Sequence, residues 1–227
     1  MTINILLFGV FPYVAMVIAV LGAWARFDMA QYTWKAQSSQ MLRTKNMRVA
    51  SNLFHIGVIF ILFGHFVGLL TPEVIYHHFI STQAKQLLAM VSGGFFGILC
   101  FIGLTMLIYR RLVDERVRAN TTVSDMLVLI MLWLQLTLGL LSIVVSTHHL
   151  DGSVMVQLAN WAQSIVSLAP LKAAAYVESV HIIYKLHILL GLSLLVVFPF
   201  TRLVHIVSAP IWYFGRRYQV VRQKQQA

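Results

Sequence analysis

Residues 51–72 read SNLFHIGVIFILFGHFVGLLTP, and this stretch decides the fold class of the chain. It is long and apolar enough for a helix that crosses a hydrocarbon core of about 30 Å at about 1.5 Å per residue. Pro72 ends the helix because proline cannot extend the hydrogen-bond ladder. Two histidines, His55 and His65, lie within the stretch. An ionisable side chain is costly in hydrocarbon, so both imidazoles are expected to have strong partners.

The rest of the chain shares this apolar character. Of its 227 residues, 59% are hydrophobic and 11% are charged, proportions that do not suit a water-facing surface. The apolar stretches lack the two-residue alternation of barrel strands and are about twice as long as such strands need to be. We therefore predict an all-α integral membrane bundle that forms one domain over residues 1–227. Its five predicted spans are residues 5–25, 53–70, 87–108, 126–145 and 180–207.

The net charge of +10 is unevenly distributed. Most basic residues follow the first, third and fifth spans: Arg26, Lys35, Arg43, Lys45, Arg48, Arg110, Arg111, Arg116, Arg118, Arg216, Arg217, Arg222 and Lys224. The opposite side has only Lys85 and Lys172, with Lys185 just inside a span. By the positive-inside rule this places the N-terminus outside and the C-terminus in the cytoplasm. The basic character therefore indicates membrane topology and not a nucleic-acid partner.

One further stretch is amphipathic and not wholly apolar. Residues 154–168 place apolar side chains on one helical face and polar side chains on the other. Such a helix is expected to lie on the outer membrane interface, where it would roof a site at that surface.

The chain has a single cysteine, Cys100, inside an apolar span. This excludes a disulfide framework, and the thiol is expected to be a buried packing group. It also means that the chain has no cysteine set for an iron–sulfur cluster.

The spacing of the histidines predicts two pairs. His187 and His205 are 18 residues apart, which is five turns at about 3.6 residues per turn, so they share one face of a continuous helix. Because that helix is antiparallel to residues 53–70, His65 should pair with His187, and His55 with His205. The separations along the two helices differ, at about 15 Å and about 27 Å. A kink at Pro199 would shorten the longer path.

Two imidazoles from facing helices are a common way to hold a haem, and such ligation leaves no open position for oxygen. Two haems at different depths would form an electron path across the membrane. A single intramembrane histidine is instead often a hydrogen-bonded structural residue or part of a proton relay. A proton-coupled transporter is therefore a second hypothesis, although the sequence lacks inverted repeats and broken helices. A bare structural anchor would not explain the buried histidines.

Several motifs resemble those of one protein family. They are QYTWKAQSSQML from Gln31, SNLFHIG and GHFVGLLTP around His55 and His65, HLDGS from His149, WAQSIV from Trp161, KLHILLG around His187 and FPFTRLVHI, which contains His205. The chain resembles the gamma subunit of respiratory nitrate reductase, a di-haem cytochrome b membrane anchor. This resemblance implies two haem b groups: a distal, outer haem on His65 and His187, and a proximal haem on His55 and His205.

The same resemblance implies a site for quinol, the substrate, at the outer face. Lys85 matches the family's lysine at the start of the third span, which helps to hold a quinone oxygen or a haem propionate, and Gly64 matches its glycine beside the outer ligand. An interfacial, snorkelling lysine is the alternative interpretation of Lys85. Arg110, Arg111 and Arg202 lie near the expected depth of the inner haem, where they either pair with its propionates or simply mark the cytoplasmic side.

The resemblance further implies that the chain is one subunit of a quinol-dependent nitrate reductase in the bacterial inner membrane. It would take electrons from menaquinol or ubiquinol and pass them through the two haems to a cytoplasmic iron–sulfur subunit, which supplies a molybdenum catalytic subunit. These partners would dock on residues 28–48, residues 110–120 and the C-terminal tail. The di-haem anchor of a formate dehydrogenase, a hydrogenase or a disulfide reductase is the nearest alternative.

Overall fold

The regular secondary structure is all helical, with no strand, in residues 2–36, 38–208 and 215, which are the residues that the computed structural model describes. The α-helices are α1 (Thr2–Asn4), α2 (Phe11–Met29), α3 (Met47–Leu70), α4 (Glu73–Tyr76), α5 (Thr82–Val113), α6 (Glu115–Ala119), α7 (Val123–Ser146), α8 (Ser153–Val166), α9 (Pro170–Val177) and α10 (Ile182–Val197). Around them are a π-helical turn, η1 (Ile5–Val10), and the 3-10 helices η2 (Gln31–Thr33), η3 (Phe198–Phe200) and η4 (Arg202–Ile206).

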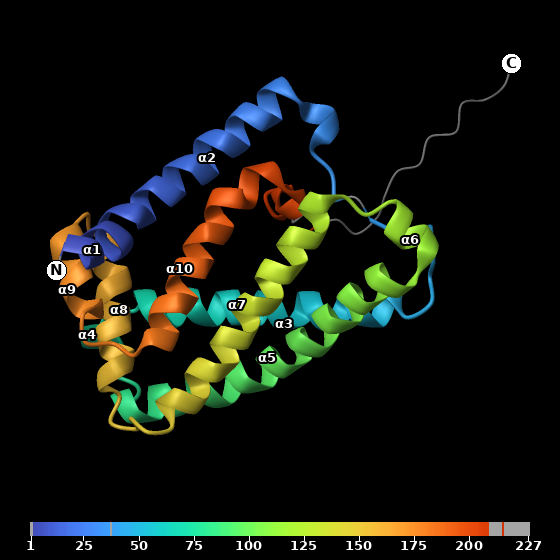
Figure 1. Ribbon diagram of the computed structural model, residues 1–227. Helices are drawn as coiled ribbons and strands as arrows, with labels where there is room; N and C mark the ends of the chain where they lie inside the picture. Colours follow the sequence, from blue (N-terminus) through green and yellow to red (C-terminus); the bar gives the residue numbers. More distant parts are fainter. Residues whose placement is uncertain (1, 37, 209–214, 216–227) are drawn as a thin grey trace, which may run out of the picture.

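Five helical segments in these residues are long and apolar enough to cross a membrane: Ile5–Met29, Met47–Leu70, Thr82–Val113, Val123–Ser146 and Ile182–Phe200. The predicted all-α membrane bundle is confirmed in this respect. The long helices pack in the order α2, α10, α7, α5 and α3, each against the next. In Figure 1, α3 passes behind α10 and α7.

The last predicted span, residues 180–207, is wrong as a single helix. Helix α10 ends at Val197, and the chain then makes two 3-10 helices separated by Thr201, whose backbone is extended with φ −123° and ψ 179°. Pro199 accounts for the break because it has no N–H to donate to the carbonyl four residues earlier. His205 therefore lies on η4, and it does not share a helical face with His187.

This break removes the mismatch between the His55–His65 and His187–His205 separations. From His187, α10 continues for ten residues to Val197, a rise of about 15 Å. The ten residues from His55 to His65 on α3 span the same distance. The short segment after the break then brings His205 to the depth of His55.

Helices α3 and α5 approach each other closely through two glycines. A Cβ atom added at Gly57 of α3 would lie 2.6 Å from Cβ of Cys100, and one at Gly103 of α5 would lie 2.7 Å from the carbonyl oxygen of Ala50. Cys100 is 2% exposed, so the thiol is a packing group of this interface, as predicted. Small residues that allow such backbone contact are typical of helix pairs in membranes.

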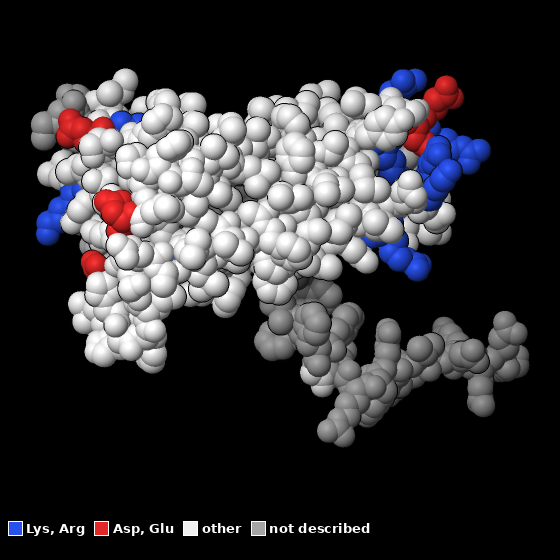
Figure 2. Space-filling model, turned by 90° about the horizontal axis from the view of Figure 1, so that it is seen from below, with Lys and Arg blue, Asp and Glu red and all other residues white. Residues whose placement is uncertain are grey.

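Charged side chains gather at the two ends of the bundle. Figure 2 shows a band free of Lys, Arg, Asp and Glu across the middle of one face, with most Lys and Arg at the end where α6 lies. We call this the α6 end, and we call the opposite end, formed by α4, α8, α9 and the N-terminus, the α9 end (Figure 1). The basic residues at 216, 217, 222 and 224 lie outside the described residues.

The α9 end is covered by two short helices. The amphipathic helix predicted over residues 154–168 is α8, whose Trp161 indole donates to the carbonyl of Phe8 at 2.9 Å. Helix α9 was not predicted, and it packs so closely on η1 that a Cβ at Gly9 would lie 2.7 Å from the carbonyl oxygen of Pro170. Gln163 of α8 donates to the carbonyl of Leu69 at 3.0 Å and so joins this cover to the end of α3.

Candidate cofactor site

The structure brings the four intramembrane histidines together as two pairs. The ring centroids of His65 and His187 are 6.1 Å apart, and those of His55 and His205 are 6.3 Å apart. Imidazole nitrogen–metal bonds are about 2 Å long, so two imidazoles on opposite sides of one metal ion have centroids about 6 Å apart. Both pairs therefore have the spacing that one shared metal ion requires.

In each of these histidines, Nδ1 donates to a backbone carbonyl oxygen. The acceptors are Ser51 for His55 at 2.7 Å, Ile61 for His65 at 2.8 Å, Gln135 for His187 at 3.1 Å and Arg202 for His205 at 2.6 Å. This bond fixes the tautomer in which Nε2 has the free lone pair, as is usual for metal-ligating histidines. All four imidazoles therefore have an Nε2 lone pair that can bind a metal.

The surroundings suit haem better than a bare metal ion. Among residues 2–36, 38–208 and 215, no group of three or more His, Cys, Asp or Glu side chains is arranged to hold a metal. A pair of imidazoles is sufficient for haem iron, because the porphyrin supplies the other four nitrogens. Beside His65, a Cβ added at Gly64 or Gly68 would meet no atom within 4 Å, which leaves room for a flat cofactor.

His187 differs from the other three in having its acceptor on a neighbouring helix. Gln135 belongs to α7, and its side-chain amide also lies 3.3 Å from Nε2 of His187. A metal on Nε2 would displace that amide contact but leave the Nδ1 bond in place. Gly139, one turn further along α7, lies against the same ring: its added Cβ would be 3.1 Å from Cε1 of His187.

The segment with His205 is held by an arginine from α2. Arg26 donates through Nη1 to the carbonyls of Pro199 and Thr201, at 2.7 and 2.8 Å. These carbonyls follow the end of α10, where helical partners are lacking. The arginine therefore stabilises the turn that redirects the chain toward His55.

Lys85 lies in the first turn of α5, at the α9 end. Its ammonium group is 3.7 Å from the centroid of the Tyr76 ring, a cation–π contact. Its Nζ atom is buried and has no hydrogen-bond partner among the described residues. A buried ammonium without a hydrogen-bond acceptor is costly, so the arrangement favours an oxygen-containing ligand at this position.

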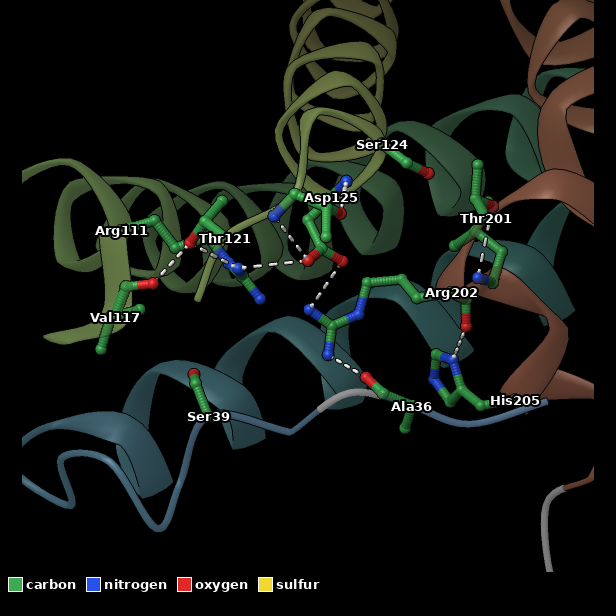
Figure 3. Close-up of polar contacts among 12 residues, drawn as sticks. Ala36, Ser39, Arg111, Val117, Thr121, Ser124, Asp125, Thr201, Arg202 and His205 are labelled. Carbon is green, nitrogen blue, oxygen red and sulfur yellow. Dashed lines mark hydrogen bonds and ion pairs between the residues drawn. The ribbon is translucent and has the colours of Figure 1, made fainter. Parts of the chain in front are cut away.

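The three arginines considered as propionate partners already contact protein groups. Arg110 donates to the side chain and carbonyl of Ser39, at 2.5 and 2.9 Å, and to the carbonyl of Arg43. Arg111 and Arg202 lie 3.7 and 3.5 Å from the carboxylate of Asp125 (Figure 3). Burial and the neighbouring Arg111 lower the pKa of Arg202, while Asp125 opposes this shift. A role toward propionates stays a prediction.

Sequence reasoning did not identify several residues of this site. Gln135 was visible only as a polar residue within a span, and Tyr76 only as part of a loop. Asp125 was visible only as the start of a helix. Each acts through a contact with a residue on another element, and spacing within one segment gives no signal for such contacts.

Comparison with known proteins places the chain in a family. A family model described as the nitrate reductase gamma subunit matches residues 4–224. The chain is 47% and 46% identical, over 222 residues, to the respiratory nitrate reductase 1 and 2 gamma chains of Escherichia coli (strain K12), with 98% of each chain covered. It is 34% identical over 220 residues to the nitrate reductase gamma chain of Bacillus subtilis (strain 168), covering 96% of this chain and 98% of that one. The chain therefore belongs to the nitrate reductase gamma subunit family.

Proposed function

We propose that this chain is the membrane subunit of a bacterial respiratory nitrate reductase and binds two haem b groups. His65 and His187 would ligate one haem iron, and His55 and His205 the other. The observation that carries this proposal is the geometry of the two pairs, with centroids 6.1 and 6.3 Å apart and each Nδ1 bonded to a carbonyl. When bound, each haem supplies an iron that changes between the ferric and ferrous states without exposing an open coordination position.

The chain's own residues would define where quinol is oxidised. Quinol is placed at the α9 end, beside His65, where Gly64 leaves space and Lys85 offers an ammonium group to a quinol oxygen or a propionate. The ring of Tyr76 holds that ammonium in place. Helix α8, joined to α3 by the Gln163–Leu69 hydrogen bond, would cover this position and limit access of water. Protons would be released at this end.

The α6 end would face the cytoplasm and the partner subunits. The concentration of Lys and Arg at that end supports this orientation by the positive-inside rule (Figure 2). The loop before α3 and the segment around α6 would contact an iron–sulfur subunit, which passes electrons to a molybdenum subunit that reduces nitrate. The gamma-chain names of the relatives support a multi-subunit complex of this kind.

The test is an optical spectrum of the purified complex, oxidised and then reduced with a quinol analogue. We expect two low-spin b-type components, of which His65→Ala removes one and His205→Ala the other. His181→Ala is a matched control, because His181 caps the start of α10 without belonging to either pair. Wild-type protein without b-type absorption, from cells supplied with haem, would exclude the proposal and favour a transporter.

A second measurement separates the quinol site from the haem ligands. Lys85→Gln should retain both b-type components but oxidise quinol at least about tenfold more slowly, because a charged hydrogen bond contributes about 1.5–3 kcal/mol. Lys185→Gln is the control, since its ammonium donates to the carbonyl of Glu178 at 2.9 Å. Co-purification of the partner subunits would distinguish a nitrate reductase from the anchor of another redox complex.

A further inference from the structure

One buried carboxylate at the α6 end is not used by the proposed function. Asp125 lies in the first turn of α7 and is 3% exposed. Its position is fixed by a capping box, in which the Thr122 hydroxyl accepts from the backbone N–H of Asp125 at 3.2 Å and Asp125 accepts from the N–H of Thr122 at 3.3 Å. The side chain therefore has a defined place before any other partner is considered.

Two guanidinium groups from distant elements converge on this carboxylate. Arg111, at the end of α5, lies 3.7 Å from Oδ2, and Arg202, on η4, lies 3.5 Å from Oδ1. The Arg111 and Asp125 side chains are 8% and 4% exposed, so this ion pair is shielded from water. Arg202 also donates to the carbonyl of Ala36, in the loop before α3 (Figure 3). Asp125 thus joins α7, α5 and η4 at one point.

Arg202 also contacts His205, the proposed ligand of the inner haem. Its backbone carbonyl accepts the Nδ1–H of His205 at 2.6 Å, as Figure 3 shows. Arg202 therefore contacts Asp125 through its side chain and orients the His205 ring through its main chain. Thr201, just before it, is 4% exposed and caps η4 by accepting from the N–H of Leu203 at 3.4 Å.

The His205 ring depends on such contacts more than the other three rings do. The acceptors for His55 and His65 are carbonyls four residues earlier within the regular helix α3. The acceptor for His187 lies within α7, which is also a long helix. By contrast, η4 is a five-residue 3-10 helix that follows a break at Thr201. Short 3-10 helices have poorer hydrogen-bond geometry, so their position is set by tertiary contacts.

We propose that Asp125 is a positioning residue for His205, acting through Arg202. The inference rests on the proposed function, in which His205 ligates the inner haem iron. The charge of Asp125 holds the Arg202 side chain, and this fixes both the direction and the strength of the Nδ1–H bond to the Arg202 carbonyl. Such bonds to a ligating histidine increase its basicity and so favour the ferric state.

The test is Asp125→Asn in the complete complex, examined by redox titration and low-temperature EPR. Asparagine preserves the shape but removes the negative charge that Arg111 and Arg202 contact. We expect the reduction potential of the inner haem to rise and its low-spin g values to shift, with both properties of the outer haem unchanged. The g values respond mainly to the orientation of the axial imidazoles, whereas the reduction potential responds also to nearby charge.

Asp114→Asn is the matched control. Asp114 also lies at the α6 end, is 9% exposed, caps a helix and pairs with an arginine, Arg43, at 2.5 Å. It has no link to His205 among the described residues, so this variant should leave the inner haem signal as in the wild type. Asp125→Glu keeps the charge that holds Arg202, so it should return both the potential and the g values toward the wild-type values.

The outcomes separate the two proposals. A wild-type protein without two b-type components would overturn the proposed function and this inference together. Two normal components in the wild type, with unchanged inner g values in Asp125→Asn, would overturn only the inference. If Asp125→Asn does not accumulate, Asp125→Ser, which also removes the charge, takes its place: wild-type inner g values would overturn the inference, and shifted values with an intact outer signal would support it.

Discussion

Nδ1 of His187 on α10 donates to the backbone carbonyl of Gln135 on α7, across 3.1 Å. The ring is therefore oriented by a helix other than its own. Changes on α7 close to Gln135 that leave both histidines intact should consequently affect the His65–His187 pair and not the His55–His205 pair.

Gly139→Ala tests this dependence. The added Cβ would lie 3.1 Å from Cε1 of His187, so the ring must shift by a few tenths of an ångström. Overpacking of this kind typically costs about 1–3 kcal/mol. We expect a shifted spectrum for the outer haem, an unchanged inner haem and a lower unfolding temperature. Gly93→Ala is the control, because its Cβ would be 3.8 Å from the nearest atom, on Ile143, and it should change neither spectrum.

Tyr76 should influence quinol oxidation through Lys85. Tyr76→Leu removes the aromatic ring under the ammonium, a contact that contributes about 0.5–2 kcal/mol. We expect the KM for quinol to rise several-fold in steady-state assays, while both haem spectra stay unchanged. Tyr76→Phe keeps the ring and loses only the hydroxyl contact with Thr82 at 3.2 Å, so its KM should stay close to the wild-type value. Equal KM values for the two variants would contradict a cation–π role.

Arg26 should be needed for the inner haem and not for the outer one. Arg26→Gln removes the charged donors to the carbonyls of Pro199 and Thr201, each bond contributing about 1.5–3 kcal/mol when the donor is charged. We expect the inner b-type component to be reduced in amount, as measured by haem content per protein. Arg26→Lys keeps the charge but cannot contact both carbonyls as a fork does, so its effect should be intermediate. Equal loss of both haems would indicate a general folding defect instead.

Asp114 should give a pH-dependent contribution to stability. The backbone N–H of Val117 and the side chain of Arg43 lower the pKa of Asp114 below its usual value of 3.8. A carboxyl whose pKa is lower in the folded state stabilises that state above its unfolded pKa, and the contribution is lost as the pH falls through the folded pKa. The wild type should therefore unfold at a higher temperature than Asp114→Asn at pH 7, and this difference should shrink below about pH 4. A constant difference across this range would contradict the prediction.

The spans and the histidine pairs were predictable because each depends on a regular physical period. The thickness of the hydrocarbon core sets the length of an apolar helix, and antiparallel neighbours must bring His65 near His187 and His55 near His205. The break after α10 was only partly predictable. Pro199 signals a kink, but the extended conformation of Thr201 is held by Arg26, which lies 175 residues earlier in the chain.

The contacts around the histidines were not predictable, since they join segments that are distant in sequence. The Asp125–Arg202 ion pair and the Gln135–His187 hydrogen bond both depend on how α7 packs beside the final segment. Helix α9 was missed for a related reason. Helix α9 has only eight residues, too few for a segment to be recognised as a helix from its pattern, and it is held by the close contact of Gly9 with Pro170.

In the proposed function, the contact of α3 with α5 at Gly57 and Gly103 would affect the speed of electron transfer. The backbones of α3 and α5 lie in close contact there, and this contact restrains α3. Helix α3 contains His55 and His65, one member of each pair, and these rings are further fixed by carbonyls of the same helix. If haem iron bound to these rings gained or lost an electron, the rings on α3 would be restrained from moving. Fast one-electron transfer needs a small nuclear rearrangement. Here the close contact made possible by Gly57 and Gly103 would help to keep that rearrangement small.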